Sequence, residues 1–283
     1  MSHHHHHDTT HIDWNDMGPQ LERGAELHRP LYEQAAAWIG EQVPAAAVRR
    51  ILDIGSGPGV ISSMLADAFP YAEVVAVDGT PELLERARAR DGRLHTRVAQ
   101  LPDDIDELGE ADLIWAGNAV HHLGDQGAAL TTLARLLRPG GLIAVAEGGL
   151  RPRHLPRDLG FGRPGLEGRL DVAHAEWFAQ MRESLPGATA QTEDWRALLA
   201  AAGLTPGATR SFLLDIPAPV PAAVREHVVA TFAWLREGLA GQLSADDTAA
   251  LDRLLDPDDK QGLTHRPDCY LLAARTVFTA RRA

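Results

Sequence analysis

Residues 51–60, ILDIGSGPGV, place three glycines at alternate positions directly after an apolar run. A glycine lets the backbone approach a ligand without interference from a Cβ atom, and the first amides of a following helix are free to bind polar groups. Gly55, Gly57 and Gly59 therefore predict a loop that holds a nucleotide-like cofactor. The dinucleotide fingerprint needs a glycine where Val60 stands, and this difference disfavours a pyrophosphate ligand.

Two aspartates accompany the glycines. Asp53 lies inside the apolar run, and Asp78 ends the next β-branched run, EVVAVD. A carboxylate at the end of the second strand can accept hydrogen bonds from both ribose hydroxyls of an adenosine. Asp78 and the pattern D-x-G-x-G-x-G together are a stronger signal for an adenosine ligand than either feature alone.

The elements that must position these residues are indicated by the pattern of residues 50–150. Short β-branched runs alternate there with longer helical stretches, which is typical of a parallel sheet with helical crossovers. We expect strands at 50–54, 73–77, 94–98, 112–116 and 142–147. We expect helices near 58–68, 81–90 and 126–137.

The regions on either side of this core have other patterns. Residues 19–43 have helical spacing, but Pro30 predicts two short helices rather than one. The Pro-, Gly- and Arg-rich residues 150–165 predict a loop. Further helices are expected at 171–185, 192–204 and 221–240, and strands at 211–216 and within 268–282.

Charge and cysteine content limit the class of protein. The chain of 283 residues has 39 acidic and 27 basic side chains, and its formal charge of −12 repels polyanions, so we expect no nucleic acid partner. Its one cysteine, Cys269, excludes an intramolecular disulfide. We find no long apolar stretch and no secretory leader, and we expect a cytoplasmic protein without a membrane partner.

Four segments of the chain resemble the class I S-adenosylmethionine-dependent methyltransferases. They are DIGSGPG (53–59), VDGTPELLERAR (77–88), ADLIWAGNAVHHL (111–123) and LLRPGGLIAVAE (136–147). The resemblance implies an α/β, Rossmann-like fold, in which a seven-stranded, mostly parallel sheet with an antiparallel last strand has helices on both faces. It also implies S-adenosyl-L-methionine as the cofactor and S-adenosyl-L-homocysteine as the product.

The resemblance also suggests how the chain is divided. A His-rich tag or disordered tail is expected at 1–12 and a helical N-terminal arm at 13–44. The methyltransferase domain would then occupy 45–283, with lid segments at 150–190 and 217–266. In the family, such additional segments shape the substrate pocket.

Cofactor contacts follow from the resemblance, residue by residue. Asp78 matches the ribose ligand, and Asp53 matches the acid that orders the glycine loop and meets the amino group of the methionine part. Gly79 stands where a bulky residue often packs against the adenine. The cofactor-binding residues expected in addition to the two aspartates are Gly55, Ser56, Gly57, Gly59, Gly79, Ala99, Gln100 and Asn118.

Methyl transfer is an in-line displacement at a sulfonium carbon, so alignment and exclusion of water can supply most of the catalysis. A positioned base adds about 10² to 10⁴-fold when the acceptor must lose a proton. His121, His122 and Glu147 follow the fourth and fifth strands, at the edge where open α/β sheets bind ligands, and we rank His122 first. The alternative for the two histidines is a packing role. No compact ligand spacing indicates a metal, and none is expected.

Substrate contacts are expected from the arm and the lid. His28 and Tyr32 lie four residues apart on one helix face and could close over the substrate or the methionine carboxylate. Arg153 and His154 could meet an acidic substrate, and Trp177 could wall an aromatic pocket. Solvated side chains and ordinary helix packing are the alternatives.

The sequence thus predicts an enzyme that transfers a methyl group to the oxygen, nitrogen or carbon of a small-molecule acceptor. A homodimer is allowed for. Two alternatives are an NAD(P)-binding oxidoreductase and a protein that binds S-adenosylmethionine without transferring its methyl group. Stabilisation by S-adenosylhomocysteine rather than by NAD(P) would separate the first alternative from the prediction.

Overall fold

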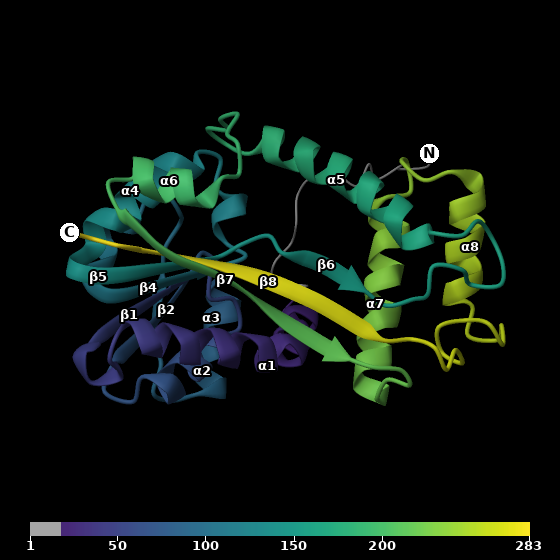
Figure 1. Ribbon diagram of the computed structural model, residues 1–283, viewed down its shortest axis with the longest axis horizontal. Coiled ribbons are helices and arrows are strands. Elements are labelled where there is room, and N and C mark those ends of the chain that lie inside the picture. Colours follow the sequence, from purple (N-terminus) through teal and green to yellow (C-terminus); the bar gives the residue numbers. More distant parts are fainter. Residues whose placement is uncertain (1–17) are drawn as a thin grey trace, which may run out of the picture.

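The computed structural model describes residues 18–283 (Figure 1). The His-rich stretch expected at 1–12 and the beginning of the arm, 13–17, lie outside the described residues. The ribbon has a layered α/β body, and the helices α7 and α8 lie beyond one end of its sheet. No helix within residues 18–283 has the length and apolar character that crossing a membrane requires.

Five parallel strands form the centre of the sheet, in the order β3-β2-β1-β4-β5. They are β1 (Arg50–Ile54), β2 (Glu73–Asp78), β3 (His95–Val98), β4 (Ala111–Gly117) and β5 (Leu137–Ala146). The crossovers contain α2 (Val60–Ala68), α3 (Pro81–Arg90) and α4 (Gln126–Leu136). The α/β, Rossmann-like fold expected from the alternating pattern is confirmed.

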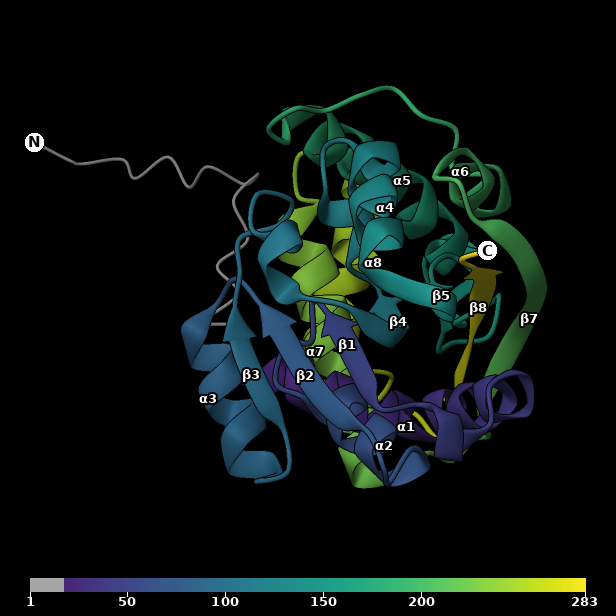
Figure 2. The same cartoon turned by 90° about the vertical axis from the view of Figure 1, so that its left-hand side faces the viewer.

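Side chains of the central strands alternate between two cores. Ile51 and Leu113 belong to the core shared with α1 (Gly18–Gln42) and α2, whereas Leu52 and Ile114 belong to the core shared with α4 and α6 (Trp195–Ala201). Figure 2 shows these helices on opposite sides of the strands. Because helices cover both faces of the sheet, the central strands have nearly continuous apolar sequences.

The other side of the sheet is antiparallel. The strand β8 (Leu271–Arg281) pairs with β5 through its second half and with β6 (Leu150–Arg153) through its first half, while β7 (Thr205–Ile216) pairs along its other edge. The sheet therefore has eight strands, one more than the seven expected.

The prediction of a loop throughout residues 150–165 is wrong for its first four residues, which form β6. The chain leaves β5 through Gly148 and Gly149, both with positive φ, and continues in the direction of β5 beside β8. A Cβ atom on Gly149 would lie 2.3 Å from the carbonyl oxygen of Ala274, so only glycine allows this approach. The strand forms because β8 supplies partners for its backbone groups.

The prediction of two short helices in the arm is also wrong, because α1 is one continuous helix with Pro30 inside it. Pro30 is exposed, whereas Leu31, Ala35 and Ile39 are fully buried. Before the proline, Arg90 of α3 binds the carboxylates of two α1 residues, Glu22 and Glu26. Packing on both sides of the proline outweighs the backbone hydrogen bond that it removes.

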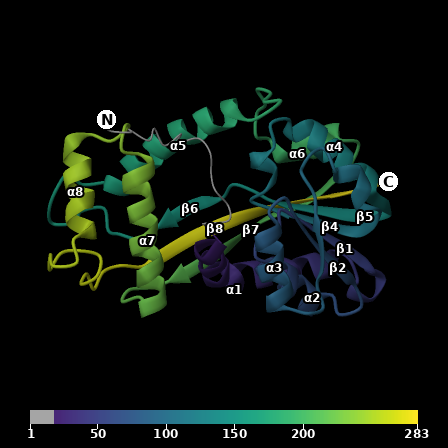
Figure 3. The same cartoon turned by 180° about the vertical axis from the view of Figure 1, so that it is seen from behind.

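The predicted lid segments contain α5 (Leu166–Ser184), α7 (Ala222–Gly238) and α8 (Ala245–Leu255). Figures 1 and 3 show α7 and α8 side by side beyond the end of the sheet, with α5 running back from them toward α4 and α6. The helix α8 is not among the predicted ones. It begins with an N-cap, Ser244, and Asp247 in its first turn pairs with Arg169 of α5 at 2.7 Å. This pair joins α5 to α8.

Candidate functional site

The glycine loop after β1 has a conformation that only glycine adopts easily. Gly55, Gly57 and Gly59 have φ angles of +67°, +53° and +75°. Cβ atoms on Gly55 and Gly59 would lie 2.6 Å and 2.5 Å from the Cβ atoms of Ala119 and Ala87, so these two glycines are required by packing. A Cβ atom on Gly57 would have no neighbour within 4 Å. Gly57 therefore borders the open side of the loop, where a ligand can approach its backbone.

Asp78 lies across this loop. One carboxylate oxygen accepts the N–H of Gly57 and the other accepts the N–H of Thr80, both at 2.9 Å. Each oxygen keeps a second lone pair for a hydroxyl. Close by, the buried Ser56 Oγ has no hydrogen-bond partner among the described residues. A carboxylate with free lone pairs and an unpaired buried hydroxyl fit a polar ligand such as the ribose and methionine parts of S-adenosylmethionine.

Asp53 faces α2, on the side of β1 that carries Ile51 and not Leu52. Its side chain is buried, and the Ser62 hydroxyl donates to Asp53 Oδ2 at 2.5 Å. Burial raises the pKa of Asp53 to about 7; the Ser62 hydrogen bond opposes this, and the negative charge of Asp78 adds to it. Its contact with α2 fixes the end of β1, and its contact with a cofactor amino group stays a prediction.

Gly79, Ala99 and Gln100 come together beside Asp78. The Gln100 amide donates to the carbonyl oxygen of Gly79 at 3.0 Å, and a Cβ atom on Gly79 would lie 2.9 Å from Gln100 Oε1. Ala99 is buried, and its N–H donates to the Asp78 carbonyl at 3.0 Å. The end of the Gln100 side chain thus occupies the space beside Gly79.

Asn118 ends β4 in a strained conformation. Its φ of +51° is the one positive value at a non-glycine position in residues 18–283. Its side-chain amide donates to the Tyr32 hydroxyl at 2.9 Å, and the Tyr32 ring packs edge-on against Trp115. The arm helix α1 therefore contacts the residue that follows β4, and the contact of Tyr32 with a substrate or the methionine carboxylate stays a prediction.

Glu147, directly after β5, holds the short helix η3 (Val120–His122) and one histidine in it. Oε1 accepts the N–H groups of Ala119 and Val120 at 3.1 and 3.0 Å, and the His121 N–H lies 3.4 Å away. Oε2 accepts the Nδ1–H of His121 at 2.7 Å. With its Nδ1 proton held by a carboxylate, the His121 imidazole exposes Nε2 as a proton acceptor.

His122 is in a different environment. Burial is the largest cause that lowers its pKa to about 3, and the neighbouring His121 and Arg182 contribute to the same shift. A histidine with such a pKa stays neutral and is a weak proton acceptor at neutral pH. The geometry favours His121 over His122 as the base, in contrast to the ranking from sequence.

The lid helix α5 covers the histidine pair, a contact that the sequence did not predict. The Phe178 ring lies 5.4 Å from the His121 ring, between centroids. Arg182 donates to the carbonyl oxygens of His121 and Leu123 at 2.8 and 2.6 Å. An arginine in the last turn of an amphipathic helix is normally solvated, so no sequence signal distinguishes this one.

Comparison with known proteins identifies the family. Residues 52–143 match a family model described as a methyltransferase domain. The chain is 33% identical over 197 residues to trans-aconitate 2-methyltransferase of Methylobacterium radiotolerans, an alignment that covers 65% of this chain and 72% of that protein. The chain belongs to the class I S-adenosylmethionine-dependent methyltransferases. S-Adenosyl-L-methionine is therefore the cofactor of this methyltransferase.

Other relatives agree with this assignment. The methyltransferase is 36% identical over 137 residues to malonyl-[acyl-carrier protein] O-methyltransferase of Pseudescherichia vulneris, covering 46% of this chain and 51% of that protein. Its fold is similar to the YcgJ protein of Bacillus subtilis, with a TM-score of 0.50 and 19% identity over 88% of this chain and 99% of that one. The family membership decides against the NAD(P)-dependent oxidoreductase.

Two other predicted substrate residues of the methyltransferase contact helices of the predicted lid segments. Trp177 of α5 packs edge-on against Trp234 of α7, with ring centroids 5.5 Å apart, and His174 contacts both. Trp177 therefore joins α5 to α7. Arg153 pairs with Asp171 of α5.

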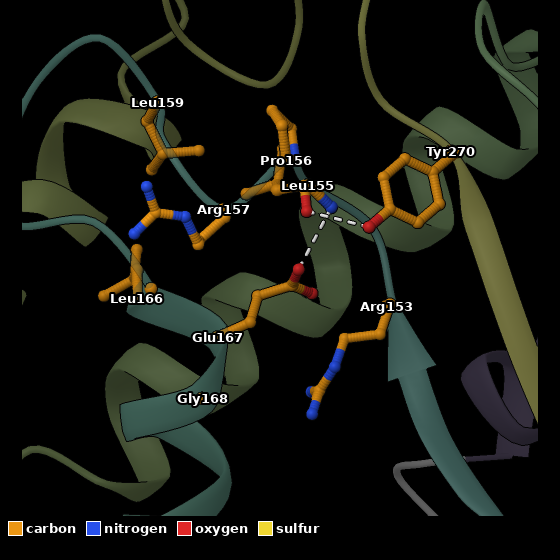
Figure 4. A pocket seen from close by; sticks show the side chains of 10 residues that line it. Arg153, Leu155, Pro156, Arg157, Leu159, Leu166, Glu167, Gly168 and Tyr270 are labelled. Atoms are coloured by element: carbon orange, nitrogen blue, oxygen red, sulfur yellow. Dashed lines mark hydrogen bonds between the residues drawn. The ribbon is translucent and has the colours of Figure 1, made fainter.

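A pocket of about 300 Å³ opens beside β6 in the lid (Figure 4). Glu167 accepts the N–H groups of His154 and Leu155 at 2.9 and 3.1 Å, and Tyr270 donates to the Leu155 carbonyl at 2.9 Å. These bonds hold the wall of the pocket. Glu167 also lines a second pocket of about 100 Å³, which His154 shares with Phe232 of α7. The pocket lining in Figure 4 is Arg153, Leu155, Pro156, Arg157, Leu159, Gly165, Leu166, Glu167, Gly168 and Tyr270.

The described residues contain no group of three or more His, Cys, Asp or Glu side chains placed to hold a metal ion. A reaction that needs no metal stays a prediction.

Proposed function

We propose that this methyltransferase methylates a small-molecule acceptor held between the carboxyl ends of β1 and β4 and the two helices α1 and α5. The observation that supports this most directly is the contact of α1 and α5 with the residues that follow β4. Tyr32 of α1 reaches Asn118 from one side, and Phe178 of α5 packs on His121 from the other. A small molecule fits between these helices more readily than a folded polymer, and the charge of −12 disfavours nucleic acid.

The bound cofactor supplies an activated methyl group. The glycine loop and Asp78 orient it, and Asn118 lines its methionine end. Exclusion of water by Phe178 and the adjoining lid residues favours the displacement, because the positive charge of the sulfonium is lost as the methyl group leaves. His121 takes up the proton that the acceptor loses, and Glu147 keeps its Nε2 in the accepting form.

The names of two relatives support an acidic acceptor. Trans-aconitate is a carboxylic acid, and a malonyl group attached to a carrier protein keeps one free carboxylate. We infer an acceptor of this chemical class, with oxygen as the methylated atom. A hydroxyl oxygen of such an acid is a sufficient nucleophile once it is aligned with the methyl carbon and His121 accepts its proton.

Labelling of a cell extract tests the proposal. The purified protein is incubated with methyl-labelled S-adenosylmethionine and a dialysed or an undialysed extract, and the products are separated by mass spectrometry. We expect label in a small molecule that is present only before dialysis. Label in protein or nucleic acid would contradict the proposal, and an absence of label despite cofactor binding would favour the alternative of binding without transfer.

An Asp78→Ala variant is the control, because it should lose cofactor binding and labelling together. The affinity for S-adenosylhomocysteine is expected to fall by about 1.5 to 3 kcal/mol if the carboxylate binds the ribose hydroxyls.

The homodimer and the cytoplasmic location also stay predictions. Light scattering would show a dimer as twice the chain mass of 30.6 kDa.

A further inference from the structure

Three histidines and one arginine gather where α1 and α7 meet the ends of β6 and β8. The His28 ring of α1 and the His227 ring of α7 meet edge-on, with centroids 6.2 Å apart. His154 follows β6, and the charges of His154 and Arg275 both act on His28. Arg275 shares a face of β8 with Leu271 and Ala273, which pack in the core that contains α1.

Three nitrogens in this cluster are buried without a partner among residues 18–283. They are His28 Nε2, His154 Nε2 and Arg275 Nε. The other ring nitrogen of each histidine is bound, since His28 Nδ1 lies 2.8 Å from the Gly24 carbonyl and His154 Nδ1 lies 3.1 Å from Glu167 Oε1. Both acceptors require the proton on Nδ1, so both Nε2 atoms are left for a ligand. His154 is only 3% exposed. Buried polar atoms nearly always have a hydrogen-bond partner, so an unpaired nitrogen here indicates that a ligand can supply one.

Arg275 is the permanent cation of the cluster, and the neutral forms of two histidines are favoured. Burial lowers the pKa of His28, and Arg275 and His154 lower it further, against the raising effect of the Gly24 carbonyl. Burial, together with His28, His154 and Arg23, lowers the pKa of His227 to about 4. Glu167 is the acid that faces the cluster, and it is already bound to His154 and two backbone amides. Arg275 Nη1 already donates to the Gly148 carbonyl at 3.3 Å, whereas its Nε has no acceptor among the described residues. An anion would supply that acceptor and would allow the imidazoles to become donors.

We propose that this cluster binds a carboxylate of the methyl acceptor, with Arg275 Nε, His28 Nε2 and His154 Nε2 as its donors. The inference rests on the proposed function for the identity of the ligand. The cluster and the predicted cofactor site share the helix α1, because Tyr32, which contacts Asn118, follows His28 by one helical turn, about 6 Å along α1.

Titration with acetate tests the site without knowledge of the natural acceptor. Imidazole signals of the protein bound to S-adenosylhomocysteine are followed by NMR at constant ionic strength, with acetamide as the neutral probe of the same shape. We expect saturable shifts of the His28 and His154 signals with acetate, stronger at pH 6 than at pH 8, and none with acetamide. No saturable shift with acetate, or equal shifts with both probes, would overturn the proposal.

Variants separate the site from general damage to the fold. Arg275→Gln should weaken acetate binding at least fivefold, and Arg275→Lys should restore part of it, while the affinity for S-adenosylhomocysteine stays unchanged. His95 is exposed and lies near Glu73 in another part of the protein, so His95→Gln is the matched control and should leave acetate binding unchanged. Equal loss of acetate binding in His95→Gln and Arg275→Gln would contradict the assignment of the site.

The charge of the labelled product links the site to turnover. A product that keeps the bound carboxylate is retained by an anion exchanger at pH 7 and released at low pH. A neutral labelled product would overturn the carboxylate proposal but leave methyl transfer intact. An absence of any labelled product would contradict the proposed function, and the acetate titration would still decide on the binding site.

Discussion

Two glutamates hold two histidines in this methyltransferase, one pair at the end of β5 and the other in the lid. Glu147 accepts backbone amides of the η3 turn and the Nδ1–H of His121; Glu167 accepts backbone amides after β6 and the Nδ1–H of His154. Both pairs leave Nε2 unbound by the glutamate. The surroundings differ. His121 is close in the chain to Ala119, which packs on Gly55 of the glycine loop, whereas His154 lies near His28, His227 and Arg275.

The different surroundings of the two Glu–His pairs suit them to different tasks, proton transfer for one and anion binding for the other. Beside the cofactor, an imidazole with a bound Nδ1 proton is suited to accept a proton. Among arginine and histidine side chains, the same imidazole is suited to bind an anion. The chemistry of each pair is therefore set by the elements packed around it, and the following changes test that distinction.

Removing the two glutamates is expected to have the largest effect. Glu147→Ala leaves buried backbone amides and the His121 ring without an acceptor and should lower the free energy of unfolding by about 3 kcal/mol. Glu167→Ala should cost about 1.5 kcal/mol, because Glu167 is the more exposed of the two. Urea unfolding at pH 7 measures both values.

Glu107→Ala is the control for this pair of variants. Glu107 forms an exposed ion pair with Arg97, and its removal should change stability by less than about 0.5 kcal/mol. A larger loss for Glu167→Ala than for Glu147→Ala would contradict the view that Glu147 is the more important structural acceptor.

Replacing the two histidines should separate turnover from binding. We expect His121→Gln to lower kcat about 100-fold with little change in KM, because a base acts in the transition state. We expect His154→Gln to raise KM about tenfold with kcat nearly unchanged, because a carboxylate is bound equally in both states. Steady-state kinetics with the acceptor from the extract give both constants. If both variants lost kcat equally, the two pairs would not have separate roles.

The central sheet and cofactor loop could be predicted because their signals are local. Five strands and three crossover helices follow from runs of β-branched and apolar residues. The left-handed turns at Gly55, Gly57 and Gly59 follow from the absence of a Cβ atom. Asp78 could be placed because parallel strands end at the same edge of a sheet, which brings it to Gly57.

The lid and the choice of base depend on contacts between distant residues. The strand β6 exists because β8 pairs with it, and the partner of Leu150 is Ala274. The continuity of α1 across Pro30 depends on packing against other elements. His121 and His122 are adjacent and chemically identical, and only the position of Glu147 and the burial of His122 distinguish them. A single sequence contains no direct signal for such contacts.

Two buried aspartates extend the comparison to pH. The pKa of Asp53 is raised from 3.8 to about 7 in the folded protein. Between pH 4 and 7 the folded chain therefore retains a proton that the unfolded chain has lost, and the stability of the fold falls as the pH rises. Asp53→Asn removes this cost. We expect the Asp53→Asn variant to be roughly 2 kcal/mol more stable than the parent at pH 8. This is about half of the free energy that corresponds to the pKa shift, because the amide oxygen accepts the Ser62 hydrogen bond more weakly than a carboxylate does. Urea unfolding between pH 4 and 8 measures the difference.

Asp247 in the lid is the matched opposite case. The hydrogen bonds from Arg169 lower its pKa; burial raises it, and Ser244 lowers it again. Its stabilisation is present above pH 3.8 and lost as the pH falls through the lower folded value, so Asp247→Asn should be less stable than the parent at pH 8. A gain of stability in Asp247→Asn, or a loss of stability in Asp53→Asn at pH 8, would contradict the opposite effects expected for the two aspartates.

The smallest expected effect concerns His122, which tests whether the histidine next to the proposed base is purely structural. Its folded pKa of about 3 lies below the ordinary 6.5, so below pH 6.5 the unfolded chain takes up a proton that the folded chain refuses. Stability therefore falls as the pH decreases from 6.5 toward 3. His122→Gln should remove about 1 kcal/mol of the loss between pH 6.5 and 5.5. The exposed His95→Gln should leave that loss unchanged. The kcat of His122→Gln should stay within about twofold of the parent, because a ring with so low a pKa is a weak proton acceptor at neutral pH. Two results would make His122 a candidate base again. One is a pH dependence of unfolding that is the same in His122→Gln and the parent, and the other is a large loss of kcat.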